Sequence, residues 1–427
     1  MDNLSDKLKA MGVRLGAPKP LPPPGEELAA PRPGDEPPGR LLPRGERKPL
    51  PIEAVVQGSY RPTIYGEIFA VETLYPAGYI HGSVPLKGNH TFNTMAEWAR
   101  ASQLAQAQLE GFIFLDAETS GLAGGTGTFA FLVGLGRYVP QGFQLMQFFM
   151  RTPGEEAALL AALSEWIEPF EALVTYNGKS FDAPLLNTRY VLQGLNSPLV
   201  GVPHVDLLHL ARRLWRERLA SRSLKAIETD ILGATRTQEE VPGWMVPELY
   251  FEYLRSGDAS PLSGVFYHNA LDVVSLAALM GHTSRMLDDP LGHLDQPGLD
   301  LVSLGRLYED MGDLDRAIQL YEAGLERGLP EDFYWKTVAR FAELYKHQKA
   351  WPPALALWQK AAGHGELYAF VELAKYYEHE QRDPAQAAEW TEQALDRVEQ
   401  PAFPGYQRTI WRGELEHRLA RLRAKMG

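Results

Sequence analysis

Two acidic residues, Asp116 and Glu118, follow the short apolar run GFIFL and are the first candidates for chemistry in this sequence. The run is typical of a buried strand, and side chains two apart on a strand point to the same side. We therefore expect both carboxylates to leave one face of a sheet at its edge. Because apolar neighbours cannot offset two such charges, the pair requires cations. Taken alone, the pattern is equally typical of an acidic loop after a strand.

A second acidic candidate, Asp182, lies in the segment LVTYNGKSFDAPLL. A strand is expected to end at Tyr176, and after a short turn that includes Asn177 a helix should begin near Phe181. Asp182 would then lie in the first turn of that helix, close to the edge of the sheet. The same position is also favoured by the helix dipole, so a purely structural role is an alternative.

A third group of residues lies in FYHNALDVVSLAAL, which contains Tyr267, His268 and Asp272. Positions four apart on a helix share a face, so His268 should lie beside Asp272. An imidazole beside an acid that faces other carboxylates is suited to proton transfer near neutral pH. Tyr267 and His268 are both candidates for orienting an attacking water, and we prefer His268 because of its spacing from Asp272.

The elements that must position these residues follow an α/β order. Apolar runs predict strands over residues 111–116, 129–139, 143–151 and 171–176. Amphipathic patterns predict helices over 155–167 and 181–192, between 206 and 232, and over 263–287. Three consecutive strands followed by alternating helix and strand predict a mixed five-stranded sheet whose first three strands form an antiparallel meander. We assign residues 111–290 to this domain, and we interpret Asp206 as a helix cap rather than a metal ligand.

The residues before this domain divide into two segments. Twelve of the 32 prolines fall between Pro18 and Pro51. A segment with so few large apolar residues does not offset its ordering entropy, so residues 1–50 are expected to be a disordered tail. Residues 51–110 carry aromatic residues among glycines and prolines, which predicts short strands and turns in an arm packed on the next domain.

Residues 298–427 follow a different period. Small and aromatic residues recur at the spacing of tetratricopeptide repeats in three successive helical hairpins. The positions are Leu304, Gly305, Tyr308, Ala317 and Tyr321, then Ala342, Tyr345, Ala354, Trp358 and Ala361, then Ala374, Tyr377, Ala387 and Ala394. A basic amphipathic segment, 407–425, fits a capping helix. The sequence thus predicts an all-α repeat domain, and such domains bind protein or peptide partners.

Composition limits the remaining function classes. The chain has no cysteine, which excludes thiolate metal sites and cysteine nucleophiles, and its oxygen ligands suit Mg²⁺ or Mn²⁺. Its formal net charge of −12 argues against a general nucleic-acid coat protein. The N-terminus lacks the apolar core of a signal peptide, and the apolar stretch near 129–135 is too short to cross a bilayer. We expect a cytoplasmic protein without a membrane contact.

One segment is an exception to the acidic composition. ARRLWRERLASRSLK carries Arg212, Arg213 and Arg216 among six basic residues and a single glutamate, Glu217. Such a helix is suited to contact phosphates, and a solvated face that pairs with acidic neighbours is the alternative. Asn177, Arg212, Arg213 and Arg216 are therefore candidate nucleic-acid contacts.

In order and spacing, the three acidic motifs resemble the DnaQ-like DEDD exonucleases of the ribonuclease H-like fold. The matching residues are Asp116, Glu118, Asn177 to Asp182, and Asp272. More narrowly, SGLAGGTGTFAFLVGLGRY, SLKAIETDILG, VPGWMVPELYFEYL and YHNALDVVSLA look like the bacterial YprB-type proteins, which join a ribonuclease H-like domain to C-terminal tetratricopeptide repeats. The resemblance covers roughly residues 55–400.

The resemblance implies a mechanism. Asp116, Glu118, Asp182 and Asp272 would hold two Mg²⁺ or Mn²⁺ ions and hydrolyse phosphodiester bonds at the 3′ end of single-stranded DNA or RNA. In the family, either Tyr lies four residues before the last Asp or His lies five before it. Here the two types are exchanged, at His268 and Tyr267. Alternatives are an endonuclease, and a catalytically weak nucleic-acid-binding or scaffold protein that uses its repeats to bind a partner.

Overall fold

Seven strands form one sheet in the order β1-β2-β7-β6-β5-β8-β9. The computed structural model describes residues 48–426 except 89–90, 122–126, 169, 237–240 and 293–295, so most of the expected proline-rich tail lies outside the described residues. The strands of the sheet are β1 (Ser59–Thr63), β2 (Gly66–Pro76), β5 (Phe112–Thr119), β6 (Ala130–Val139), β7 (Gly142–Phe149), β8 (Ala172–Thr175) and β9 (His204–Asp206).

The sheet is mixed, as the sequence predicts, but it has seven strands rather than five. β5, β6 and β7 form the expected antiparallel meander, and β8 and β9 extend it in parallel beyond β5. The additional strands come from the arm: β2 pairs with β7 along eight residues, from Phe69 to Pro76, and β1 pairs with β2. The short hairpin of β3 (Ile80–His81) and β4 (Val84–Pro85) stands apart from the sheet.

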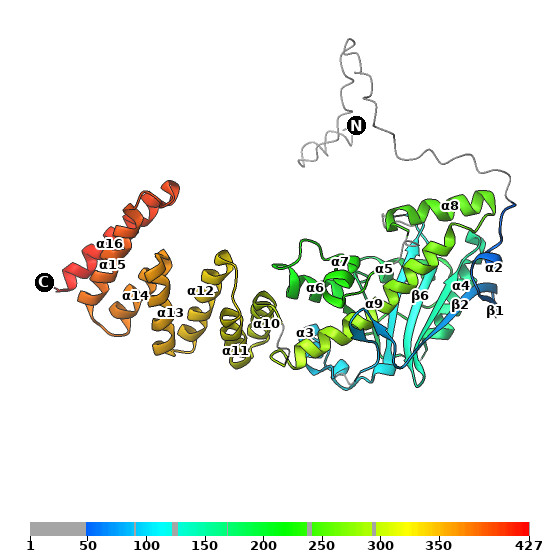
Figure 1. Ribbon diagram of the computed structural model, residues 1–427, viewed down its shortest axis with the longest axis horizontal. Coiled ribbons are helices and arrows are strands. Elements are labelled where there is room, and N and C mark those ends of the chain that lie inside the picture. Colours follow the sequence, from blue (N-terminus) through cyan, green and yellow to red (C-terminus); the bar gives the residue numbers. More distant parts are fainter. Residues whose placement is uncertain are drawn as a thin grey trace, which may run out of the picture. The chain divides into compact units, whose positions relative to one another are not determined.

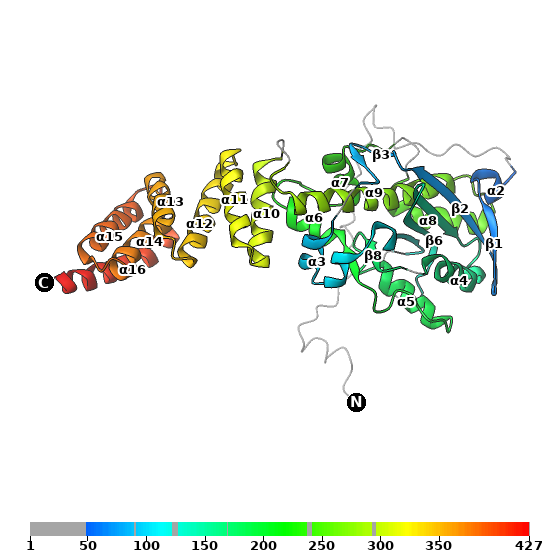
Figure 2. The ribbon, with the colours of Figure 1, turned by 90° about the horizontal axis from the view of Figure 1, so that it is seen from below.

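Alternating side chains of the sheet serve two separate cores. Phe112 and Phe114 of β5 pack in the core that includes α9 (Leu262–Asp288) and α6 (Leu207–Trp215). Ile113 and Leu115 pack in the core that includes α4 (Glu156–Ile167) and α5 (Asp182–Leu192). Figures 1 and 2 show α9 crossing one face of the sheet and α4 and α5 covering the other. By the two-residue period of a strand, Asp116 and Glu118 belong to the face that α9 covers.

Helix α9 lies very close to β6. A Cβ atom added at Gly134 of β6 would come within 2.3 Å of Asn269 Oδ1 and 2.9 Å of Val273 Cγ2. Glycine at this position therefore allows the helix to reach the strand that pairs with Asp116. By length and composition α9 is the one described helix able to cross a membrane, but 67% of its most apolar window is buried inside the protein.

Shorter helices complete this part of the chain. After α6 come α7 (Leu224–Ile227) and a single π-helical turn, η4 (Glu228–Leu232). α2 (Ile52–Val55), α3 (Asn93–Ala99) and α8 (Val246–Ser256) lie around the sheet. The π turn begins at Glu228, whose side chain is buried.

The C-terminal region is all helical. Its helices are α10 (Gly298–Met311), α11 (Leu314–Glu326), α12 (Glu331–His347), α13 (Trp351–His364), α14 (Leu367–His379), α15 (Pro384–Glu399) and α16 (Gly405–Met426). They follow one another as hairpins in Figure 1. The small residues that the repeat pattern requires are buried between paired helices, for example Ala317, Ala354 and Ala387. A Cβ at Gly305 would lie 3.0 Å from the ring of Tyr321, which explains the glycine there.

Candidate active site

The acidic candidates meet where the parallel strands end. β5 presents Asp116 and Glu118, and a register shift in its pairing with β6 lies at Glu118 and Thr119. Asp182 is the first residue of α5. Asp272 lies on α9, three residues after Asn269. Ligands of open α/β sheets bind at the carboxyl ends of strands, and bulges next to such sites re-aim side chains. We call Asp116, Glu118, Asp182 and Asp272 the carboxylate cluster.

Asp116 is fixed by a buried amide chain that the sequence analysis did not identify. Asn269 Nδ2 donates to Asp116 Oδ2 at 2.9 Å, and Gln147 Nε2 donates to Asn269 Oδ1 at 2.9 Å. Gln147 also donates to the carbonyl of Phe266. Both amides are buried, so each needs such partners. Asn269 stands out in the sequence as a polar residue on the buried face of α9. Its partner Asp116, however, lies 153 positions earlier in the chain.

Burial and neighbouring charges raise the pKa of three carboxylates of the cluster. Burial, followed by the charges of Asp272, Glu118 and Asp182, raises the pKa of Asp116 well above its ordinary value. Burial and the charges of Asp272 and Asp182 raise the pKa of Glu118 to about 8. For Asp182, burial is again the largest cause, and its pKa rises to about 7 even though it accepts backbone hydrogen bonds. The cluster therefore lacks enough positive charge to ionise fully at neutral pH.

One basic side chain, Arg236, reaches the carboxylate cluster, and no local sequence pattern predicts this contact. The guanidinium of Arg236 forms ion pairs with Asp272 and Glu228, and only 5% of its side chain is exposed. Arg236 Nε donates to Glu228 Oε2 at 2.6 Å and Nη2 donates to Oε1 at 2.5 Å, which is a bidentate arrangement. Arg236 thus holds one of the four predicted metal ligands.

Arg236 also determines how His268 faces the carboxylate cluster. Arg236 Nη1 lies 3.1 Å from His268 Nδ1, and a guanidinium can only donate. Nδ1 must therefore accept, so the neutral imidazole carries its proton on Nε2. That atom lies 3.4 Å from Asp272 Oδ2 and 4.0 Å from Glu118 Oε1. In this arrangement His268 presents a hydrogen-bond donor to the cluster rather than a basic lone pair.

Tyr267, the alternative to His268, has Tyr75 and Tyr79 of the arm region as neighbours. Burial is the main reason that the pKa of Tyr75 rises to about 12, and the proximity of Tyr79 and Tyr267 adds to it. Burial and Tyr267 likewise raise the pKa of Tyr79. The structure therefore places His268 against two cluster carboxylates and places Tyr267 near a pair of phenols.

Asp206 acts as the predicted helix cap and also fixes the turn after β8. Its side chain accepts from the backbone N–H of Leu208, Asn177 and Lys179 at 3.1, 2.7 and 3.1 Å. Asn177 has the left-handed φ of 68°, which asparagine tolerates better than most residues. This buried carboxylate orders the segment that leads to Asp182.

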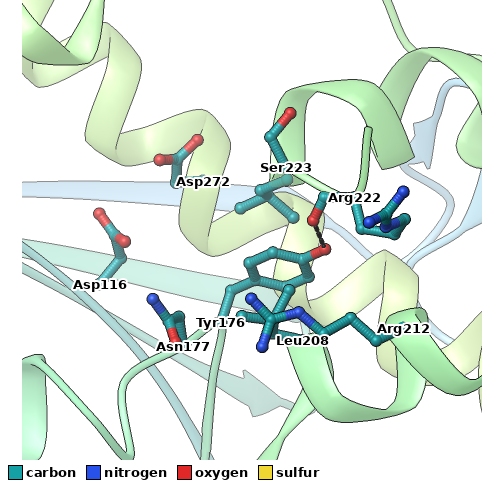
Figure 3. A pocket seen from close by; sticks show the side chains of 9 residues that line it. Asp116, Tyr176, Asn177, Leu208, Arg212, Arg222, Ser223 and Asp272 are labelled. Carbon is teal, nitrogen blue, oxygen red and sulfur yellow. Dashed lines mark hydrogen bonds between the residues drawn. The ribbon is translucent and has the colours of Figure 1, made fainter. Parts of the chain in front are cut away.

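A pocket of about 460 Å³ opens next to the carboxylate cluster. Figure 3 shows Asp116 and Asp272 on one side of it, Arg212 and Arg222 on the other, and Tyr176 between them. Asn177, Leu208, Ser223 and Leu224 complete the lining. A site with acids on one wall and guanidinium groups on the other is suited to a metal-bound phosphate ester.

The basic segment divides between two roles. Arg212 faces the pocket beside Asp116, as expected of a phosphate contact. Arg213 instead forms an ion pair with Asp310 of α10, and Arg218 forms one with Asp300. Arg216 is exposed, and among the described residues no carboxylate lies within ion-pair distance of it. The ion-pair interpretation therefore holds for Arg213 and Arg218, and phosphate contact stays a prediction for Arg212 and Arg216.

The carboxylate oxygens suit a hard cation, but the described residues do not form a preformed metal site. Among them, no group of three or more histidine, aspartate or glutamate side chains has a geometry that would hold an ion. The ion pair from Arg236 to Asp272 is one physical reason. Residues 122–126 and 237–240, which follow Glu118 and Arg236 in the chain, lie outside the described residues.

Sequence profiles of two known families match the two regions of this chain. Residues 113–284 match the sequence profile of the RNase_H superfamily, and residues 301–332 match that of a tetratricopeptide repeat. The uncharacterized protein YprB of Bacillus subtilis is 31% identical over 355 residues, which are 78% of this chain and 82% of that protein. A family B DNA polymerase from the archaeon Pyrobaculum calidifontis matches 47% of this chain and 29% of its own, with 15% identity and a TM-score of 0.28.

Proposed function

This chain belongs to the YprB family, with an RNase H-superfamily domain followed by tetratricopeptide repeats, and we propose that it is a metal-dependent nuclease. One observation carries the proposal. Four carboxylates from β5, α5 and α9 meet beside a pocket that also presents Arg212 and Arg222, and burial together with neighbouring charges raises the pKa of three of them, Asp116, Glu118 and Asp182. Strongly perturbed groups that meet at a pocket are typical of functional sites.

The carboxylate cluster would hold two Mg²⁺ or Mn²⁺ ions. Bound there, the ions would activate a water molecule and neutralise the charge that develops on the leaving 3′ oxygen. Asn269 would keep Asp116 aimed into the site through its 2.9 Å hydrogen bond. The guanidinium of Arg236 binds Oδ1 of Asp272, so an ion would bind Oδ2 or replace the guanidinium at Oδ1.

The remaining groups would bind and orient the substrate. Arg212 and Arg222 face Asp116 across the pocket and would bind phosphate oxygens, with Asn177 beside them. His268 would orient the attacking water. Nε2 carries the proton in the observed arrangement, so it would first donate a hydrogen bond to the water or to a phosphate oxygen. It would accept a proton only after Arg236 releases Nδ1.

We propose the 3′–5′ exonuclease direction and a single-stranded DNA or RNA substrate from the resemblance of the acidic motifs. The test is incubation of 5′-labelled single-stranded and duplex DNA and RNA with Mn²⁺ or EDTA. Stepwise shortening from the 3′ end in Mn²⁺ only is the expected result. Internal cuts would favour an endonuclease with the same metal chemistry.

Asp116→Asn is the variant that tests the site, since it keeps the shape of the side chain and removes its charge. We expect at least about a 100-fold loss of cleavage rate. Asp396→Asn, the same chemical change at an exposed position on α15, is the matched control and should retain full activity. Equal rates in both variants would contradict the proposal.

A second candidate function is favoured by one observation, the buried ion pair between Arg236 and Asp272. If that pair persists when metal is present, the domain would bind nucleic acid without cutting it, and the repeats would bind a protein partner. Binding of labelled strands without cleavage of any substrate would select this alternative.

A further inference from the structure

A second pocket lies beside the first, where α6 meets α10. Its volume is about 530 Å³, and its lining is dominated by guanidinium groups. The lining residues are Arg212, Arg213, Arg216, Arg222 and Arg306, with His209, Glu217 and Ser303. We call this the arginine pocket. Five arginines face one acid, so the lining is strongly positive although the chain carries a net charge of −12.

Internal ion pairs neutralise only part of this charge. Arg213 pairs with Asp310, and Arg306 Nη1 lies 3.7 Å from Glu217 Oε1. Arg212 and Arg216 are exposed, and among the described residues neither has a carboxylate within 4.0 Å. Two guanidinium groups are therefore available to bind an anion.

The junction that forms the pocket is well anchored. Arg218 of the α6 region binds Asp300 of α10 through two hydrogen bonds of 2.7 and 2.8 Å, and only 3% of the Asp300 side chain is exposed. Arg213 also donates to the backbone carbonyl of Arg306 at 2.7 Å. Apolar side chains of both helices, such as Leu214 and Leu304, share one buried core. These contacts hold Arg306 beside the arginines of α6.

The arginine pocket continues the candidate active site. Arg212 and Arg222 line both pockets, so the two cavities are adjacent along the same side of α6. An anion that extends from Asp116 past Arg212 would next meet Arg216 and Arg306. A nucleic-acid strand has this property, because its phosphates repeat at short intervals, and arginine forks match phosphate oxygens.

We propose that α6 and the first repeat helix, α10, together bind the phosphodiester backbone of a single strand whose end lies at the carboxylate cluster. This inference rests on the proposed function, and it assigns to the repeat domain a direct share in substrate binding. Arg216 and Arg306 are its defining residues, since they line the arginine pocket but not the pocket at Asp116.

The test measures binding without cleavage. Fluorescence anisotropy with a labelled 20-nucleotide strand in EDTA compares the wild type with Arg216→Gln and with Arg216→Gln/Arg306→Gln. We expect about a tenfold weaker affinity for each arginine removed. The slope of log affinity against log salt should fall by about 0.7 for each lost phosphate contact. Arg255→Gln, at an exposed position on α8 outside both pockets, is the matched control.

Competitors separate a strand from a small anion. Inorganic phosphate and a dinucleotide, which has one phosphodiester and cannot fill both pockets, should displace the 20-nucleotide strand only at far higher concentration. Because Arg216 is exposed, the Arg216→Gln variant should fold normally, and a thermal melt verifies this. Wild-type affinity in Arg216→Gln, or equal competition by phosphate, would overturn the inference.

The result is distinguishable from failure of the proposed function. Weaker binding in Arg216→Gln together with unchanged cleavage in Asp116→Asn would retain the arginine pocket and reject the nuclease site. Loss of cleavage in Asp116→Asn with normal binding in Arg216→Gln would do the reverse.

Discussion

Two groups of buried carboxylates in this chain differ in the source of their compensating charge. Near the end of α14, Glu378 exposes 1% of its side chain and accepts from Arg418, Arg421 and Lys425 of α16. Burial acts to raise the pKa of Glu378, but the Lys425 hydrogen bond and the nearby cations lower it overall. For Glu118, burial is the largest cause and the charges of Asp272 and Asp182 add to it, so its pKa rises to about 8.

The two sites differ in the number of cations that surround each acid. In the repeat domain, three basic side chains surround one carboxylate. In the carboxylate cluster, the ion pairs among the described residues involve one basic side chain other than histidine, Arg236, which also binds Glu228. Glu378 is therefore a structural residue, whereas the cluster must take up protons or cations from solution.

Of the changes that test this comparison, removal of the Arg236 side chain should cause the largest loss of unfolding free energy. In Arg236→Ala, Glu228 keeps its buried position with 2% of its side chain exposed and loses its bidentate partner. Breaking such a pair by removing one member costs about 3–5 kcal/mol of unfolding free energy. Urea denaturation without metal measures the loss. Arg236→Lys, which keeps the charge but not the fork, should lose less, and an Arg236→Ala protein of wild-type stability would contradict the pairing.

A change of pH should have the next largest effect on stability, and this effect should come from the carboxylate cluster rather than from Glu378. A carboxyl whose folded pKa is raised stabilises the fold below its unfolded pKa, and this contribution is lost as pH rises through the folded pKa. With the pKa of Glu118 at about 8 and that of Asp182 at about 7, the metal-free protein should lose about 2–3 kcal/mol of unfolding free energy for each of the two carboxyls between about pH 5 and pH 8. Mn²⁺ should cancel this loss in denaturation curves. A metal-free stability that rises over the same interval would argue against charge repulsion in the cluster.

The same substitution at both places should give small effects of opposite sign. Glu378→Gln removes an acid that three partly exposed cations bind, so we expect a loss of about 1–2 kcal/mol. Above pH 8, where Glu118 is ionised, Glu118→Gln removes a repelling charge and should stabilise the metal-free protein by about 1 kcal/mol. Parallel thermal melts measure both changes, and a loss of stability in both variants would remove the distinction.

Much of the fold follows from local patterns. The runs at β5, β6 and β7 and the amphipathic segments at α4, α5 and α9 predict their elements to within a few residues. The repeat spacing predicts the helices from α10 onward, and Asp206 caps α6 as its position before an apolar run indicates. These features depend on periodicity and on side chains a few positions apart, which a sequence displays directly.

Features that depend on distant pairing were not predictable. The sheet has seven strands because β2 pairs with β7, more than 60 positions later, and nothing local in the arm specifies that partner. Arg236 and Asn269 reach the acidic site from positions whose partners lie 36 and 153 residues away. Arg213 and Arg216 lie in the same basic segment. Asp310 of α10 nevertheless forms an ion pair with Arg213 and not with Arg216. Tertiary contacts alone separate those roles.

Calorimetric titration with Mn²⁺ at neutral pH tests the central claim most directly, because it does not depend on activity. The wild type and the Asp396→Asn control should bind the ion and release protons, since Glu118 and Asp182 are partly protonated in the free protein. Asp116→Asn should bind about 100-fold more weakly or not at all. Equal affinity and stoichiometry in all three proteins would contradict the assignment of the carboxylate cluster as a metal site.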